Sequence, residues 1–251
     1  MPATNSAWLS SSPLYAPLSC LPAALTQTRD IALLNDYARS LNICNAQGTA
    51  IHFVNCTSEV AYETHISTTG EIPTRTDNWH DYFNALAWLI WPYTKATLNA
   101  LHIRAGVTPL RNRSRDALTL LDESGIIVAC SAPELWQALD QQLWYELFVN
   151  QRQHVKTDMA FHLIGHALYE KLLRPYPSIT GKCQLVEVDK DFFQLDACTR
   201  QRQLDQQLAQ QLSAEPPLTP KIFPPLPLFG IPDTIAENSD PAYYQNTQIF
   251  R

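Results

Sequence analysis

The chain has 251 residues, of which 45% are hydrophobic and 17% are charged. This composition is typical of a globular protein with a buried core and argues against a disordered chain. The 18 Lys and Arg against 24 Asp and Glu give a net charge of −6. That balance excludes general nucleic-acid binding, because such affinity comes from neutralising phosphates.

The cysteine spacing and the N-terminus predict a cytoplasmic protein. None of the six cysteines lies in a C-x-x-C motif, so they are expected to be free thiols in a reducing compartment. No Lys or Arg precedes Arg29, so the basic start of a secretory signal is missing. The most apolar run, residues 83–91, is shorter than the roughly 20 residues that span a bilayer. We therefore expect no membrane span.

In chain order, residues 1–20 are expected to be extended, and residues 22–41 have apolar positions near helical spacing. Residues 50–54 predict a short strand. Residues 62–75 are expected to be irregular or extended, because Gly70 and Pro73 break regular structure. Asp77 or Asn78 is the predicted N-cap of a helix that reaches Trp91.

Pro92 is expected to kink or restart that helix, which then continues to about residue 102. An Arg-rich loop follows from Gly106. The apolar runs 117–121 and 126–130 flank a short turn with Gly125, which predicts a β-hairpin. Ser131 is expected to cap the next helix, with Pro133 in its first turn.

The second half of the chain predicts a helix from about 157 to before Pro175. A strand over 184–188 and a Gln-rich helix over roughly 192–212 are expected next. Residues 216–232 contain seven prolines and predict an extended arm. The predicted fold is α+β: one mostly helical domain, residues 21–215, around a small sheet that contains the hairpin. The Pro-rich arm, residues 216–251, is expected to wrap this domain.

His162, His166 and Glu170 are spaced four residues apart, so on a helix they would share one face. Two such histidines can bind a divalent metal, with the carboxylate as a further ligand or a base. The pattern is not H-E-x-x-H, so the metalloprotease base is missing. The alternative is a hydrogen-bonded core histidine beside a surface glutamate.

His80 and Asn84 share a face of the helix that starts near residue 78, and Asp81 lies about 100° from His80 around it. Beyond Pro92, Lys95, Asn99 and His102 follow. The His-Asp adjacency also resembles the HD phosphohydrolases, whose further metal ligands are not evident here. The alternative is that His80 and Asp81 only cap the helix.

Charged residues cluster between Asp81 and Glu123. No acidic residue lies between Asp81 and Asp116, whereas one lysine and four arginines do, so this stretch predicts either an anion site or a solvated loop. Asp122 and Glu123 are expected at the hairpin turn, as turn formers or as metal ligands. The sequence has no G-x-S-x-G motif, P-loop or dinucleotide fingerprint, which argues against serine hydrolases and nucleotide-cofactor enzymes.

Five stretches together resemble a bacterial family catalogued as a domain of unknown function, DUF3025. They are residues 70–75, 79–86 with 95–99, 115–125, 165–170, and 226–232 continuing through Tyr244 and Phe250. The resemblance implies no activity. It implies that the following residues belong to the family pattern: Arg75, His80, Asp81, Asn84, Arg115, Asp116, Asp122, Glu123, His166 and Glu170.

This chain departs from the family pattern in one segment. It has Asp233-Thr-Ile where the family tends towards a Gly-Trp-Trp-like segment. His162 is not expected in the pattern either, which leaves His166 and Glu170 as the candidate metal ligands.

Two functional hypotheses follow. The first is an enzyme, for example a metal-dependent hydrolase of a small anionic molecule. Its catalytic residues would be His80, Asp81, Arg115, Asp116, His166 and Glu170, and Arg75, Asn84 and Lys95 would bind substrate. The second is a non-enzymatic protein in which these groups form a buried network and the Pro-rich arm binds a partner. A separation of more than about 12 Å between His80 and His166 would rule out the enzyme.

Overall fold

The computed structural model describes residues 12–56, 61–106, 112–214 and 218–251. Its α-helices are α1 (Ala23–Gln27), α2 (Ile31–Ser40), α3 (Tyr62–Thr69), α4 (Trp79–Ile90), α5 (Pro92–Arg104), α6 (Arg113–Ser124), α7 (Pro133–Asp140), α8 (Arg152–Asp158), α9 (His166–Leu172) and α10 (Ala197–Ala214). The strands are β1 (His52–Val54), β2 (Glu71–Pro73), β3 (Gly125–Cys130), β4 (Met159–Leu163), β5 (Thr180–Glu187) and β6 (Pro225–Pro227). The predicted α+β class is confirmed.

Short 3-10 helices and one π-helical turn connect these elements. They are Pro13–Cys20, Lys190–Gln194, Pro220–Ile222, Leu228–Gly230, Ala236–Ser239 and Pro241–Gln245, with the π-helical turn at Glu146–Asn150.

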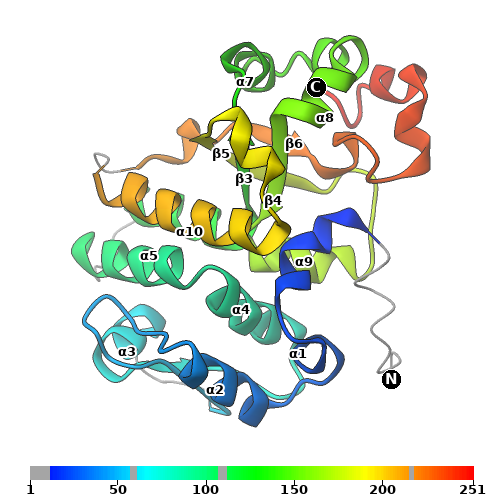
Figure 1. The fold of residues 1–251 in the computed structure, drawn as a ribbon. Coiled ribbons are helices and arrows are strands. Elements are labelled where there is room, and N and C mark those ends of the chain that lie inside the picture. Colours follow the sequence, from blue (N-terminus) through cyan, green and yellow to red (C-terminus); the bar gives the residue numbers. More distant parts are fainter. Residues whose placement is uncertain (1–11, 57–60, 107–111, 215–217) are drawn as a thin grey trace.

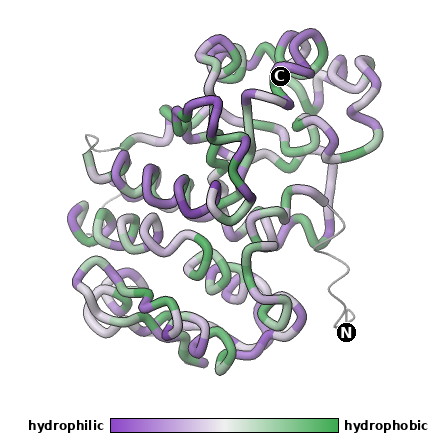
Figure 2. The backbone as a smooth tube through the Cα atoms, in the orientation of Figure 1, coloured by the Kyte–Doolittle hydropathy of each residue, from purple (hydrophilic) through white to green (hydrophobic). Residues whose placement is uncertain are grey.

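Two sheets organise the chain. The larger has the strand order β4-β3-β5-β6, with β3 parallel to β5 and antiparallel to β4. The smaller pairs β1 with β2 in parallel. In Figure 1 the larger sheet lies in the upper half, with α10 in front of it and α5, α4, α3 and α2 below. Figure 2 colours much of α10 as hydrophilic, as its Gln-rich sequence predicts.

The centre of the molecule is α4, in which every residue from Tyr82 to Ile90 is buried. Asn78 caps this helix by accepting a hydrogen bond from the Asp81 N–H at 2.9 Å, as predicted. Pro92 then occupies the first turn of α5, where its missing N–H costs nothing. The break at residue 91 is therefore encoded by the cap and the proline together. No described helix combines the length and apolar character that crossing a bilayer needs.

Several predicted elements are wrong. The hairpin does not form, because residues 113–124 are helix α6 and only residues 125–130 are a strand, β3. Apolar runs of this length fit either state, and Asn112, which accepts a hydrogen bond from the Ser114 N–H, starts the helix. Residues 157–175 are not one helix either, because α8 ends at Asp158 and β4 follows. His162 therefore lies on a strand.

Smaller corrections concern the N-terminal half. The segment predicted to be extended forms a 3-10 helix over Pro13–Cys20, and residues 1–11 lie outside the described residues. Residues 62–75 are not irregular but form α3 and β2, with Gly70 at φ 74° between them. Residues 22–41 form two helices, α1 and α2, in place of one. Ala132, not Ser131, is the N-cap of α7.

The Pro-rich stretch of the C-terminal arm is mostly buried in its described part, residues 218–232. Its strand β6 extends the larger sheet by pairing with β5. Between residues 218 and 232 most side chains are buried, and Ile222 is the one large exposed hydrophobic group described there. Near the C-terminus, Tyr244 and Phe250 are both buried, with ring centroids 5.1 Å apart.

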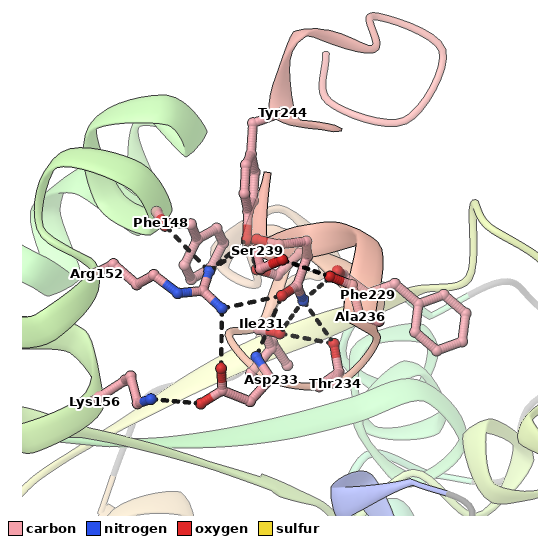
Figure 3. Close-up of polar contacts among 12 residues, drawn as sticks. Phe148, Arg152, Lys156, Phe229, Ile231, Asp233, Thr234, Ala236, Ser239 and Tyr244 are labelled. Carbon is pink, nitrogen blue, oxygen red and sulfur yellow. Dashed lines mark hydrogen bonds and ion pairs between the residues drawn. The ribbon is translucent and has the colours of Figure 1, made fainter. Parts of the chain in front are cut away.

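A polar cluster ties this arm to α8 (Figure 3). The Arg152 guanidinium contacts Asp233 Oδ1 at 3.0 Å and Asn238 Oδ1 at 3.1 Å. Asn238, which is 1% exposed, donates to the carbonyls of Phe229 and Ile231. Asp233 takes φ 65°, a left-handed conformation that glycine adopts freely and aspartate tolerates. The departure from the family pattern thus places a carboxylate where Arg152 and Lys156 bind it.

Candidate active site

The two histidines of the family pattern face each other across α4 and α9. His80 Nε2 lies 3.1 Å from His166 Nε2, with the rings 72° apart. This distance is far below the 12 Å limit that would have ruled out the enzyme hypothesis. One of the two nitrogens must donate and the other accept, so the pair shares one hydrogen.

Aromatic packing fixes the register of α4 against α9. Phe83 stacks on Tyr169 with centroids 5.7 Å apart, one turn along each helix from the histidines. Tyr169 also stacks on Tyr15 at 5.8 Å. Because both rings are buried, the helices cannot slide without losing this packing, and the histidines stay opposed.

Gly165 allows α9 to begin against the end of α6. A Cβ atom there would lie 2.5 Å from the Glu123 carbonyl oxygen and 2.6 Å from the Gly125 nitrogen. Only glycine permits this approach. It brings His166, the next residue, to Asp122 on α6, with Nδ1 3.7 Å from Asp122 Oδ2.

The histidine pair lies between two carboxylates. Glu170 Oε2 accepts from His80 Nδ1 at 3.1 Å on the outer side. Asp122 faces His166 on the inner side. The order Asp122, His166, His80, Glu170 therefore runs from the interior, where His166 is 5% exposed, to the surface, where the Glu170 side chain is 44% exposed.

A buried lysine holds the inner carboxylate. Lys95, which is 3% exposed, donates to Asp122 Oδ1 at 2.5 Å and to Asn84 Oδ1 at 2.8 Å. Asn84 in turn donates to the Tyr62 hydroxyl at 2.6 Å. Burial alone would raise the pKa of Asp122, but Lys95 and then His166 lower it more, so the net pKa lies below its usual range.

Burial keeps His166 neutral. Desolvation lowers its pKa to about 3, against a smaller opposing effect of the Asp122 charge. The neighbouring charges of Lys95 and His80 act in the same direction as desolvation, and the pKa of about 3 includes their effect. His80, by contrast, has a 38% exposed side chain. The pair therefore joins a buried neutral imidazole to one that solvent or substrate can reach.

These groups border a cavity of about 370 Å³. Its lining residues are Tyr62, Glu63, Pro73, Arg75, His80, Asp81, Asn84, His102, Thr119, Asp122, Glu123 and His166. Arg75 and Asp81 form a two-pronged ion pair at its rim, with contacts of 2.7 and 2.9 Å. Burial raises the pKa of Asp81, but the hydrogen bonds from Arg75 outweigh it and lower the net value.

Most residues predicted for the site meet here. His80, Asp81, His166, Arg75 and Asn84 border the cavity directly, whereas Lys95 and Glu170 contact residues that do.

Two predicted catalytic residues stand apart from this group. Arg115 and Asp116 lie in the first turn of α6, and neither borders the cavity as the described residues define it. The positive charge of Arg115 still reaches the cavity, because it lowers the pKa of His102.

The predicted metal ligands do not converge. His80 lies between His166 and Glu170 and contacts both. His162 bonds to Gln201 at 3.1 Å, away from the pair. Across the described ranges, no three or more His, Cys, Asp or Glu side chains are grouped to hold a metal ion.

Sequence reasoning missed Tyr62 and Glu63 and gave Asn99 and His102 no role. The first two lie on α3, in a segment predicted to be irregular. The available signal for the last two was a polar stripe on the largely buried helix α5, where Lys95, Asn99 and His102 follow at helical spacing.

A larger cavity of about 1160 Å³ lies among α2, α5 and α10, and none of the predicted site residues borders it. Its buried carboxylate, Asp205, accepts from the N–H groups of Tyr93 and Thr94 at 3.0 and 2.8 Å. It therefore caps α5. Burial raises the pKa of Asp205 to about 6, but its hydrogen bonds assign it a structural role.

The protein thus has an α+β fold and a pair of histidines, one buried and one accessible, between two carboxylates. A family model described as "Protein of unknown function (DUF3025)" matches residues 51–251. The chain belongs to this family. Comparisons with curated proteins and with solved structures found no match.

Proposed function

We propose that the chain is an enzyme in which His80 and His166 act together as general acid and base on a small molecule in the cavity. The observation that carries this proposal is the 3.1 Å contact between a buried and an accessible imidazole. A cavity of about 370 Å³ adjoins both rings. A structural hydrogen bond between two histidines would not require open space beside it.

The chain's own residues can move two protons. His80, which substrate can reach, would take a proton from an attacking water at Nε2, because its Nδ1 hydrogen is directed at Glu170. His166 would give its Nε2 hydrogen to the leaving group and regain one from His80 Nε2, and Glu170 would orient the His80 ring. Asp122, 3.7 Å from His166 Nδ1, would stabilise any positive charge that develops on this ring. Hydrolysis of a small ester or phosphoester needs both steps, since water loses a proton and the leaving group gains one.

The two cations that we expected to bind substrate, Arg75 and Lys95, do not make the substrate an anion. Arg75 is already paired with Asp81, and Lys95 with Asp122. Paired cations attract an anion weakly, because the neighbouring carboxylate repels it. Neither cation therefore favours an anionic substrate.

A panel of small chromogenic esters, amides and phosphoesters would test the proposal. We expect hydrolysis of at least one class, and His80→Gln and His166→Gln should each lower kcat/KM by about 100-fold or more. The matched control is His162→Gln, which changes a partly buried histidine bonded to Gln201 and should leave hydrolysis unchanged. Equal activity in all four proteins would refute the proposal.

A metal-dependent form rests on one feature. Both Nε2 atoms converge while each Nδ1 faces a carboxylate, the orientation of histidines that bind metal. Zinc or manganese added to chelator-treated protein would then restore hydrolysis and bind at one equivalent. Activity unaffected by chelator would assign the metal-free form.

The competing hypothesis is a non-enzymatic protein with the same groups as a buried network. Its partner-binding part loses its basis, because the described Pro-rich arm is packed. Its structural part is tested by thermal melts of His166→Ala and Arg115→Ala. A structural network requires a sharp loss of stability, about 3–5 kcal/mol, in both variants. Two unperturbed melting temperatures would exclude it.

A further inference from the structure

The wall of the cavity formed by α3 and α5 carries a second polar group that the histidine pair does not use. Asn99 Nδ2 donates to Glu63 twice, to its carbonyl at 2.9 Å and to Oε2 at 2.7 Å. His102 Nε2 lies 3.9 Å from Glu63 Oε1. Glu63 and His102 both border the cavity.

Two buried atoms of this group have no hydrogen-bond partner among the described residues. They are Asn99 Oδ1 and His102 Nδ1, on side chains of residues that are 2% and 5% exposed. The amide orientation of Asn99 is fixed, because both of its Nδ2 contacts are acceptors. Buried polar atoms without partners are rare and costly, so a ligand or water is expected to complete them.

All three groups present acceptors. Burial lowers the pKa of His102, so its ring is neutral and carries one hydrogen. Placing that hydrogen on Nε2 directs it at the Glu63 carboxylate and leaves Nδ1 with a lone pair. Glu63, Asn99 Oδ1 and His102 Nδ1 then form a set of acceptors without a free donor.

We propose that Glu63 and His102, which border the cavity, form with Asn99, which holds the Glu63 carboxylate, a binding subsite for a primary ammonium group. Such a group has three N–H donors and no acceptor, whereas a hydroxyl has one donor. Asp122 and Glu123 add carboxylates at the same cavity. Asp122 is neutralised by Lys95, and Arg115 opposes the cation from α6, so the Glu63 charge is the main attraction.

This inference rests on the proposed function, because it names the substrate class as a small amine. The ammonium group would anchor the molecule at α3 and α5. The bond that reacts would lie at the histidine pair on α4 and α9, which borders the same cavity. Paired Arg75 and Lys95 agree with a cationic substrate, since neither is available to an anion.

Binding of four probes by NMR titration tests the subsite: 1-butylamine, 1-butanol, butyrate and tetramethylammonium. Butylamine should shift resonances of α3 and α5 and bind at least 10-fold more tightly than the other three. Tetramethylammonium has the same charge but no N–H donor, so it separates hydrogen bonding from net charge. Equal binding of butylamine and butanol would overturn the inference and leave a water as the occupant.

Variants test which carboxylate binds the ammonium group. Glu63→Gln keeps the side-chain shape and should weaken butylamine at least 10-fold, whereas the control Glu187→Gln, an exposed carboxylate on β5, should not. If Glu63→Gln does not fold, the comparison of the four probes with the unaltered protein still decides.

His80→Gln separates this inference from the proposed function, because it should keep butylamine binding while losing hydrolysis. Hydrolysis that depends on His80 without amine binding would refute the subsite alone. Amine binding that depends on Glu63, without hydrolysis that depends on the histidines, would refute the proposed function alone.

Discussion

Two buried polar clusters in this molecule differ in how completely they are satisfied. In the cluster that joins α8 to the C-terminal arm, Asn238 uses both its amide donors and its oxygen, and Arg152 uses both terminal nitrogens. In the cluster at the cavity, by contrast, His102 Nδ1 and His166 Nδ1 of the lining residues, and Oδ1 of the neighbouring Asn99, lack hydrogen bonds within the described residues.

The difference separates structure from function. Unsatisfied buried polar atoms cost free energy, so a cluster that only stabilises the fold is expected to satisfy them. The arm cluster does so at Asn238 and Arg152. The cavity cluster keeps atoms poised for a missing partner, which is typical of binding sites.

Lys95→Met should have the largest effect on stability. It tests whether a residue of the cavity cluster also stabilises the fold. The change keeps the length of the side chain but leaves the Asp122 carboxylate without its cation. We expect a loss of about 3–5 kcal/mol in the free energy of unfolding, measured with urea. The double variant Lys95→Met with Asp122→Asn should recover much of it. A single variant as stable as the original chain would show that this pair is not needed for folding.

Asn238→Ala tests the arm cluster. The Phe229 carbonyl would lose its donor, the Ile231 carbonyl would keep only its contacts with Thr234, and Arg152 would lose the Asn238 side-chain acceptor. We expect about 3 kcal/mol of destabilisation, with hydrolysis unchanged at temperatures where the variant is folded. A fall in kcat without a fall in stability would contradict the assignment of this cluster to structure.

The sequence predicted the parts of the fold that local signals determine. The cap at Asn78 and the restart at Pro92 depend on neighbours within a few residues, and both are correct. The runs at 117–121 and 159–163 were assigned the wrong state, because a short apolar run fits a helix and a strand equally well.

The same limit applies to the site. Its residue types were predicted, since polar residues in buried helices are costly without a purpose. Their partners were not, because the contacts His80–His166 and Lys95–Asp122 join residues 86 and 27 positions apart. The local spacing of His162 and His166 pointed to the wrong pair. Only the crossing of α4, α6 and α9, which Gly165 permits, determines the true one.

The pH dependence of stability compares a histidine at the cavity, His166, with one outside it, His162. The pKa of His166 is lowered to about 3 and that of His162 to about 4, whereas in the unfolded chain both lie near 6.5. The unfolded state therefore binds more protons as the pH falls from about 6.5, so stability should decrease. Each histidine contributes about 1.4 kcal/mol per pH unit in that window.

Urea denaturation at several values between pH 4.5 and 6.5 measures this slope. His166→Gln should lower it by the contribution of one histidine, and His162→Gln should do the same from outside the cavity. The lowered pKa of Asp122 acts in a different window, since its stabilisation is lost only as the pH falls below about 4. An unchanged slope in His166→Gln would mean that this ring is protonated in the folded state.

Glu170→Gln should have the smallest effect on stability and isolates the outer end of the proton path. The pair of Glu170 with His80 is exposed on both sides, and such pairs contribute at most about 1 kcal/mol. The amide still accepts a hydrogen bond but carries no charge to stabilise a protonated His80. We therefore expect kcat to fall roughly tenfold with KM unchanged, measured on the substrate class that the hydrolysis panel identifies. Glu187→Gln is the matched control. If stability fell and kcat did not, Glu170 would belong to the structural framework and not to the site. The division between a structural and a functional cluster would then no longer hold at Glu170.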